Sequence, residues 1–151
     1  MITIYFDGRI EPNPGGIATY GFIITHNGKE IKRGCGVIGS GPGMTNNLAE
    51  YTALREALRW LGTKYPREGI LAKGDSKLVI NQMKGEWKIK SETSKKFVPI
   101  IQKLIKKRSV RFEWVPRYLN TEPDLLSNLA YRKYQEDSRF TNLSSTQTQL
   151  F

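Results

Sequence analysis

Four acidic residues stand where a purely structural carboxylate would be unusual. Asp7 and Asp75 each end an apolar run that predicts a core strand. Glu50 and Asp124 each lie in the first turns of a helical stretch, with apolar residues beside them. Any one of these acids could serve as a helix cap or as a solvated charge at the rim of the fold. The four together predict a site with its own chemistry.

The expected chemistry follows from how close these carboxylates would come. If the two strands are neighbours in one sheet, Asp7 and Asp75 emerge at the same edge, and the helices that carry Glu50 and Asp124 need only pack against it. Like charges so close together cannot all stay ionised without compensation. Hard divalent cations take oxygen ligands, and a few carboxylates with retained waters favour Mg²⁺. The acids therefore predict a site for a pair of Mg²⁺ ions, for which Mn²⁺ could substitute.

The net charge points to a polyanionic partner. The chain of 151 residues carries 24 basic and 14 acidic side chains, a net charge of +10. Nine of the basic residues but only two acidic ones fall between Lys84 and Arg108, where Trp87 and Phe97 lie among the charges. Basic residues interleaved with aromatic ones are typical of nucleic-acid contact. A solvated helix face is the alternative explanation of this segment.

Apolar periodicity predicts a mixed α/β domain. Alternation predicts a first strand, and two further strands are joined through Asn27-Gly28, a dipeptide typical of tight hairpin turns. Helical periodicity follows from Thr45 or Asn46, either of which can cap the helix, to a stop at Gly62. The remaining predicted elements are a strand at 69–75, a short helix from Ser76, a basic helix at 93–107 interrupted near Pro99, a strand at 110–117 and a helix at 121–136.

Length and composition indicate one domain. A chain of 151 residues with 38% hydrophobic content can bury a single core. Neither a membrane helix nor a secretory signal is apparent, so we expect a cytoplasmic protein without membrane contact. The single cysteine, Cys35, excludes an internal disulfide and suits a reducing compartment; we expect it in the core or in the hairpin.

The sequence resembles type 1 ribonuclease H, in the compact variety of archaea and many bacteria. The resemblance rests on the stretches "YFDG…NPGG…YGF", "TNNLAEYTAL", "KGDSKLVINQMKGEW" and "WVPRYLNTEPDLLSNLAY", in family order over residues 1–135. It implies a five-stranded mixed sheet of order 3-2-1-4-5 with helices on both faces. It also implies that Asp7, Glu50, Asp75 and Asp124 are the catalytic metal ligands.

The resemblance further implies a reaction and a substrate. The family cleaves the RNA strand of RNA/DNA hybrids endonucleolytically with two metal ions, leaving 5′-phosphate and 3′-hydroxyl ends. Asp7 would bridge the ions, with Glu50 and Asp75 on one and Asp124 on the other, and Glu50 would also touch a ribose 2′-hydroxyl. Asn128, one turn beyond Asp124, is an alternative fourth ligand if Pro123 displaces the helix start. Duplex RNA is a second candidate substrate, and we expect a monomer.

Substrate contacts are carried over position by position. The amides of the asparagine pair at 46 and 47 would contact the minor groove and 2′-hydroxyls, although helix capping alone would also explain them. Lysines of the 84–90 segment would contact phosphates. The full set of implied substrate contacts is Asn13, Thr45, Asn46, Asn47, Asn81, Lys84, Trp87, Lys88, Lys90 and Arg117.

The sequence departs from the longer bacterial members in two respects. A basic helical protrusion after Trp87 is absent, and the loop before Asp124 has no histidine. In the longer members, a histidine in this loop assists product release. Arg117 or Glu122 could take its place in moving product or a proton. The only histidine, His26, falls in the hairpin turn, where we expect a surface position.

The sequence leaves two other function classes open. A resolvase-type nuclease shares the sheet but usually brings extra domains, and a non-catalytic hybrid-binding module would not need four acids facing phosphates. The expected domain boundaries are a catalytic domain at 1–138 and a flexible or back-packed tail at 139–151. The tail ends in "QTQLF", which resembles a peptide that docks on the sliding clamp through Gln147, Leu150 and Phe151; the alternative is that its two apolar residues fold back onto the domain.

Overall fold

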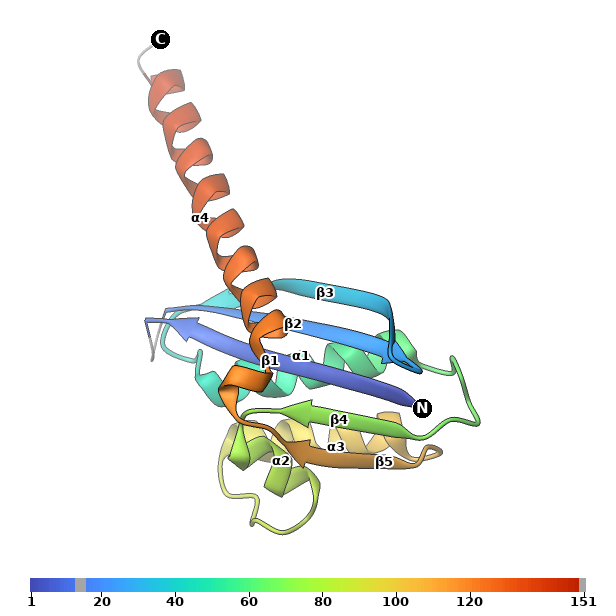
Figure 1. Ribbon diagram of the computed structural model, residues 1–151. Helices are drawn as coiled ribbons and strands as arrows, with labels where there is room; N and C mark the ends of the chain where they lie inside the picture. The colour runs from blue at the N-terminus through green and yellow to red at the C-terminus, as the bar shows by residue number, and fades with distance from the viewer. Residues whose placement is uncertain (13–15, 150–151) are drawn as a thin grey trace.

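A five-stranded mixed sheet forms the centre of the computed structural model, which describes residues 1–12 and 16–149, with side chains through residue 138. The sheet has the order β3-β2-β1-β4-β5, which confirms the predicted topology (Figure 1). β1 pairs antiparallel with β2 and parallel with β4, which in turn pairs parallel with β5. The strands are β1 (Ile2–Glu11), β2 (Ile17–His26), β3 (Lys29–Ser40), β4 (Ile70–Gly74) and β5 (Val110–Trp114).

The β2–β3 hairpin closes through the predicted turn. Asn27 and Gly28 both have positive φ, 51° and 82°, as the two central residues of a type I′ turn require. Cys35 lies in β3 and is exposed. It therefore belongs to the hairpin and not to the core.

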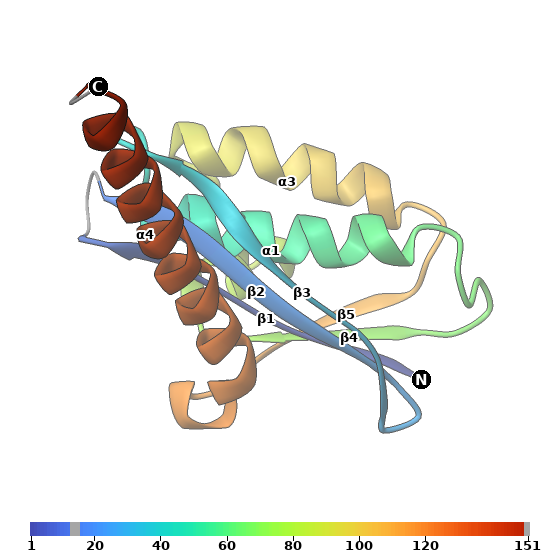
Figure 2. The same ribbon diagram turned by 90° about the horizontal axis from the view of Figure 1, so that it is seen from above.

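Helices cover the sheet unequally. The helices are α1 (Asn46–Leu61), α2 (Lys77–Met83), α3 (Glu92–Ile105), the 3-10 turn η1 (Arg117–Leu119) and α4 (Thr121–Gln149). Figure 2 shows α1 and α3 on one face and α4 on the other, where α4 contacts β1, β2 and β3. Because α4 crosses only one end of its face and then projects past β3 (Figure 1), the rest of that face carries no helix among the described residues.

Of the two caps predicted for α1, the structure has Thr45, and Ser76, predicted as the start of a short helix, caps α2. The Thr45 hydroxyl accepts from the backbone N–H of Leu48, and the Ser76 hydroxyl accepts from that of Val79. Each bond satisfies an amide at a helix start that has no partner within the helix. α1 ends at Leu61, and the predicted stop, Gly62, follows it with a φ of 46°.

Three predictions about element boundaries were wrong. β1 does not end at Asp7 but continues to Glu11, because its pairing with β2 extends beyond its pairing with β4. Pro99 does not interrupt α3; the carbonyl left without a donor belongs to Lys95, which is exposed and can be solvated. α4 does not end near residue 136 but continues to Gln149.

The core lies between the sheet and α1. Phe6, Ile4, Tyr51 and Leu54 are fully buried there, and the Tyr51 ring stacks on Phe97 of α3 at a centroid distance of 5.7 Å. α1 is therefore fixed on the sheet by the side chains next to Glu50. In the described part of the chain, every helix is too short or too polar to cross a membrane.

Candidate active site

The site begins where the parallel pairing of β1 and β4 ends. The last paired residues are Phe6 and Gly74, so Asp7 and Asp75 are the next residues of each strand. The Trp114 indole N–H donates to the Asp75 carbonyl at 3.0 Å and fixes the chain just after β4. The two carboxylates therefore emerge together, as the sequence predicts, although Asp7 lies within a continuing strand.

Gly8 brings Glu50 to this edge. A Cβ on Gly8 would lie 2.1 Å from the carbonyl carbon of Ala49, a separation that no side chain could tolerate. The glycine therefore allows the backbone of α1 to pass directly over β1, with Glu50 next to Asp7. The sequence contains this glycine, but nothing in its local pattern indicates the contact that it permits.

Asp7, Glu50 and Asp75 form a tight cluster. Each offers a carboxylate oxygen, and these atoms all lie within 4.8 Å of one another. Asp7 and Glu50 are 5% and 7% exposed. The pKa of Asp7 is raised to about 8, mainly by burial and secondly by the charge of Asp75. Burial, and then the charges of Asp7 and Asp75, raises the pKa of Glu50 well above its usual value.

Asp75 is more accessible than its two neighbours, and opposing influences act on it. Burial raises its pKa, whereas the charge of Arg117 and a hydrogen bond from Asn120 act in the opposite direction, leaving a net rise. Proton retention by several acids is the response expected of a cluster that lacks counter-charge.

Asp124 reaches the same cleft from α4 but stands apart from the tight cluster. Its Oδ1 lies 3.8 Å from Nη1 of Arg9 and 3.9 Å from Nη2 of Arg117. It also interacts electrostatically with Asp7 and Asp75. The fourth carboxylate is therefore present at the predicted place, with two guanidinium groups beside it.

The cleft at these acids has a volume of about 380 Å³ and is mainly polar. Asn128 lines a separate hollow with Arg33 and Leu129, so the helix presents Asp124, and not Asn128, to the acids. The residues that line the acidic cleft are Asp7, Gly8, Arg9, Ile10, Glu11, Asn46, Glu50, Asp75, Arg117 and Asp124.

These residues fit divalent cations. Oε2 of Glu50 and Oδ1 of Asp124 are buried, and neither accepts a hydrogen bond from any described residue. Buried carboxylate oxygens without donors are costly unless a cation takes them. Asp7, Glu50, Asp75 and Asp124 are therefore the residues that would hold the metal, and their hard oxygen atoms suit Mg²⁺ or Mn²⁺.

Sequence reasoning missed Asn120, which is 1% exposed. Its side-chain amide donates to the Phe6 carbonyl at 2.8 Å, and its hydrogen bond to Asp75 counteracts the rise in the pKa of that acid. Asn120 thus ties the chain before α4 to both central strands. It lies in a loop without periodicity, so only its place four residues before Asp124 hinted at a role.

Most of the predicted substrate contacts fall into two groups, one at the start of α1 and one at and after the end of α2. Asn46 and Asn47 begin α1 after the cap residue Thr45, and Asn46 lines the cleft. The second group follows α2, where the Asn81 carbonyl accepts from the backbone N–H groups of Glu86 and Trp87. Lys84, Trp87, Lys88 and Lys90 are exposed on the segment that follows, and Arg117 is exposed at the cleft. Asn13 lies outside the described residues.

A buried polar network holds the segment between α2 and α3. Gln82 is 4% exposed, and its amide N–H donates to the Lys88 carbonyl at 3.0 Å. Its carbonyl oxygen accepts from the Tyr51 hydroxyl and, at 2.7 Å, from the Ser94 hydroxyl. Gln82 therefore links three helices to the backbone beside Trp87. No local pattern in the sequence indicates this network, because Tyr51 and Gln82 are 31 positions apart.

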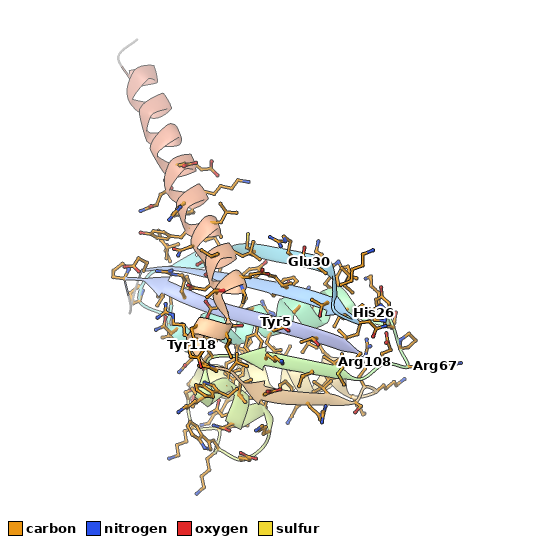
Figure 3. The ribbon with its side chains drawn as sticks, in the orientation of Figure 1. Tyr5, His26, Glu30, Arg67, Arg108 and Tyr118 are labelled. Atoms are coloured by element: carbon orange, nitrogen blue, oxygen red, sulfur yellow. The ribbon has the colours of Figure 1, made fainter. Side chains whose placement is uncertain are left out.

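His26 lies far from the acids. It pairs with Ile2 at the start of β1, its ring contacts Tyr65 at a centroid distance of 4.4 Å, and its Nε2 lies 2.5 Å from Glu68. Figure 3 shows it at the opposite end of the sheet from Tyr118. Of the two residues named as substitutes for a loop histidine, Arg117 lines the acidic cleft, whereas Glu122 lines other hollows.

A larger hollow of about 560 Å³ lies on the open sheet face, between Tyr5, Glu30 and Tyr118 (Figure 3). It contains none of the four acids. Size alone therefore does not identify the chemical site, whereas the clustering of carboxylates does.

Comparisons with known proteins identify the family of this chain. A family model described as reverse transcriptase-like matches residues 6–130. The crystal structure of LC11-RNase H1 in complex with an RNA/DNA hybrid superposes with a TM-score of 0.82 at 32% identity, covering 89% of this chain and 99% of that one. RNase H1 from the archaeon Halobacterium salinarum gives a TM-score of 0.79 at 30% identity, covering 87% and 98%.

The curated relatives include a longer protein. The bifunctional protein Rv2228c of Mycobacterium tuberculosis is 35% identical over 130 residues, which span 84% of this chain and 34% of that protein. The chain thus spans about a third of the length of the first curated relatives that it matches. On the family match and the two structures together, the chain belongs to the reverse transcriptase-like family and, within it, to the type 1 ribonucleases H.

Proposed function

We propose that this protein is an endoribonuclease that hydrolyses the RNA strand of RNA/DNA hybrids with two divalent cations and leaves 5′-phosphate and 3′-hydroxyl ends. The observation that carries the proposal is the meeting of four carboxylates from β1, α1, α4 and the end of β4 at one polar cleft. The hybrid bound to LC11-RNase H1 supports the choice of substrate. We expect the protein to act as a monomer in the cytoplasm.

The proposed roles of the acids follow from their places. Asp7 interacts with each of the other three acids, which suits it to bridge two cations, with Glu50 and Asp75 on one side and Asp124 on the other. Bound cations would lower the pKa of a water and stabilise the leaving 3′ oxygen. Glu50 lines the cleft together with Asn46, one turn before it in α1, and there it would touch a ribose 2′-hydroxyl, the group that distinguishes RNA from DNA.

The exposed basic segment after α2 would hold the DNA strand. Lys84, Lys88 and Lys90 offer charges to phosphates, and the half-exposed Trp87 offers a ring face to a sugar. Neither kind of contact reads base identity. We therefore expect hybrid cleavage without strong sequence preference, and duplex RNA as a weaker second substrate.

The test is cleavage of labelled RNA/DNA hybrid, duplex DNA, a four-way junction and duplex RNA, each with and without Mg²⁺ or Mn²⁺. We expect metal-dependent cuts in the RNA of the hybrid. The mapped products should carry 5′-phosphate and 3′-hydroxyl ends, which a ligase can join. Junction cleavage would instead indicate a resolvase-type nuclease. Tight hybrid binding without any cut would indicate a non-catalytic module.

The clamp-docking hypothesis concerns Gln147, Leu150 and Phe151. Leu150, Phe151 and the side chain of Gln147 lie outside the described part of the structure, so docking stays a prediction from the sequence. A pull-down with a sliding clamp, comparing the full chain with a chain lacking 147–151, tests it. Loss of binding at an unchanged melting temperature supports docking; a lower melting temperature without clamp binding by either form supports back-packing.

A further inference from the structure

Arg9 occupies an unusual place in the acidic cleft. It lies two residues after Asp7 on β1, and because side chains alternate along a strand, both project from the same face. Its Nη1 is 3.8 Å from Oδ1 of Asp124, and its Nη2 is 3.3 Å from Oε2 of Glu11. Nε of Arg9 is buried and donates to no described residue. The guanidinium therefore stands between the fourth acid and Glu11.

The guanidinium groups are unevenly distributed over the acids. Within 4.0 Å, Asp124 has ion pairs with Arg9 and Arg117, whereas no ion pair among the described residues involves Asp7, Glu50 or Asp75. The Arg117 side chain is 75% exposed and belongs to η1, while that of Arg9 is 24% exposed and comes from the central strand. Arg9 is therefore the more firmly placed of the two charges beside Asp124.

We infer that Arg9 is a built-in counter-ion of Asp124, which makes the two cation positions unequal. A cation binds readily at Asp7, Glu50 and Asp75, whereas a second cation at Asp124 must compete with the Arg9 guanidinium. This inference rests on the proposed two-cation function and adds a positioning residue that controls the order in which the site fills.

The physical reason is repulsion between a fixed single charge and an incoming double charge. Even at the dielectric constant of water, such a pair a few ångströms apart differs from a neutral pair by about a factor of ten in affinity. Glu11, half-exposed on the same strand and already bonded to Nη2, offers the guanidinium a partner when it leaves Asp124. The displaced charge thus stays paired, which keeps the exchange reversible.

The experiment measures Mn²⁺ binding to the cation-free protein without nucleic acid, by calorimetry and by the electron paramagnetic resonance signal of free Mn²⁺. The variants are Arg9→Gln, which removes the charge, and Arg9→Lys, which keeps it. Arg33→Gln on β3 is the matched control, since Arg33 pairs with Glu30 on an exposed surface outside the acidic cleft. Thermal melting without cation checks that each variant folds.

We expect two classes of Mn²⁺ affinity in the unchanged protein. Arg9→Gln should tighten the weaker class about tenfold and leave the tighter class within about twofold. Arg9→Lys and Arg33→Gln should change the ratio of the two Mn²⁺ affinities little. In an Asp124→Asn background, Arg9→Gln should lose its effect, because the site on which it acts is gone.

Three results would overturn the inference. In Arg9→Gln, the ratio of the two Mn²⁺ affinities could stay unchanged, or both classes could tighten equally. Alternatively, the unchanged protein and Arg9→Gln could both show a single class of Mn²⁺ affinity. Failure of the inference is distinguishable from failure of the proposed function. Unequal binding that responds to Arg9, without hybrid cleavage, would contradict only the proposed function, whereas cleavage with an unresponsive ratio would contradict only the inference.

Discussion

Asp7 faces Gly21 across the β1–β2 pair. Because Gly21 has no side chain, the start of α4 packs directly against its backbone. A Cβ on Gly21 would lie 2.4 Å from the carbonyl oxygen of Pro123. One turn further along α4, the Ser127 hydroxyl shares a buried hydrogen bond of 2.7 Å with Thr19. The glycine opposite one acid of the cleft therefore sets the position of another, Asp124.

Gly21→Ala should displace the first turn of α4 and with it Asp124. We expect the free energy of unfolding to fall by about 2 kcal/mol, since the added methyl meets backbone and not a flexible side chain, and cleavage of hybrid to fall further than stability explains. Gly43→Ala is the control, because a Cβ there meets nothing within 4 Å. Chemical denaturation and steady-state cleavage measure both effects; equal behaviour of the two variants would contradict the role of Gly21.

Asp7→Asn should abolish cleavage and preserve or tighten hybrid binding. The change removes the ligand that the proposed mechanism shares between two cations, and also one negative charge that would face phosphate. Loss of a residue in a metal's outer surroundings costs about 10- to 100-fold, so loss of this ligand should cost at least about a hundredfold in kcat. Cleavage assays and equilibrium binding of hybrid check the two parts, and native-like turnover in Mg²⁺ would refute the site assignment.

Asp124→Ala and Asn128→Ala should differ sharply. Asp124 faces the acidic cleft, whereas Asn128 lines another hollow, and an ionised oxygen binds a hard cation better than a neutral amide. We expect Asp124→Ala to lose most activity and Asn128→Ala to keep most of it. Side-by-side rate measurements decide, and the reverse order would show that Asn128 supplies the fourth ligand.

Stability without cations should fall as the pH rises from about 5 to 8. The pKa of Asp7 is about 8 in the folded protein against 3.8 ordinarily, so in this range the folded state holds a proton that the unfolded chain has lost. Linkage then lowers the free energy of unfolding with increasing pH, by roughly 2–5 kcal/mol over the range. Asp75 and Glu50 act in the same direction.

Denaturation in a chelating buffer at several pH values measures this slope. Asp7→Asn should flatten it, and saturating Mg²⁺ should remove most of it, because a cation replaces the protons. Stability that is flat or rises with pH in the chelated protein would show that the folded state does not retain protons on these acids.

Gln82→Leu should weaken substrate binding more than chemistry. The change removes the bond to the Lys88 carbonyl and leaves the hydroxyls of Tyr51 and Ser94 without their acceptor. We expect a loss of about 1–3 kcal/mol in the free energy of unfolding and a several-fold higher KM for hybrid with kcat little changed. Gln102→Leu, at an exposed position of α3, is the control; a fall in kcat at constant KM would contradict a role through the 84–91 segment.

Much of this protein was determined by its sequence alone. The Asn27-Gly28 turn, the cap at Thr45, the helix start near Ser76 and the stop at Gly62 all follow from short-range hydrogen bonding and backbone preference, so neighbouring residues suffice to predict them. The four acids stood out because polar side chains beside core residues need a reason. The predicted order of strands and helices was correct for the same local reasons.

Tertiary structure alone decided the details on which the site depends. Gly8 and Gly21 admit the backbones of α1 and α4, and Asn120 bonds to Phe6, a residue 114 positions away. Arg9 lies beside Asp124 only because the start of α4 packs on β2, the strand that pairs with β1. Such contacts join segments that are distant in the chain, and their energy depends on separations of a few ångströms, which periodicity and residue type do not encode.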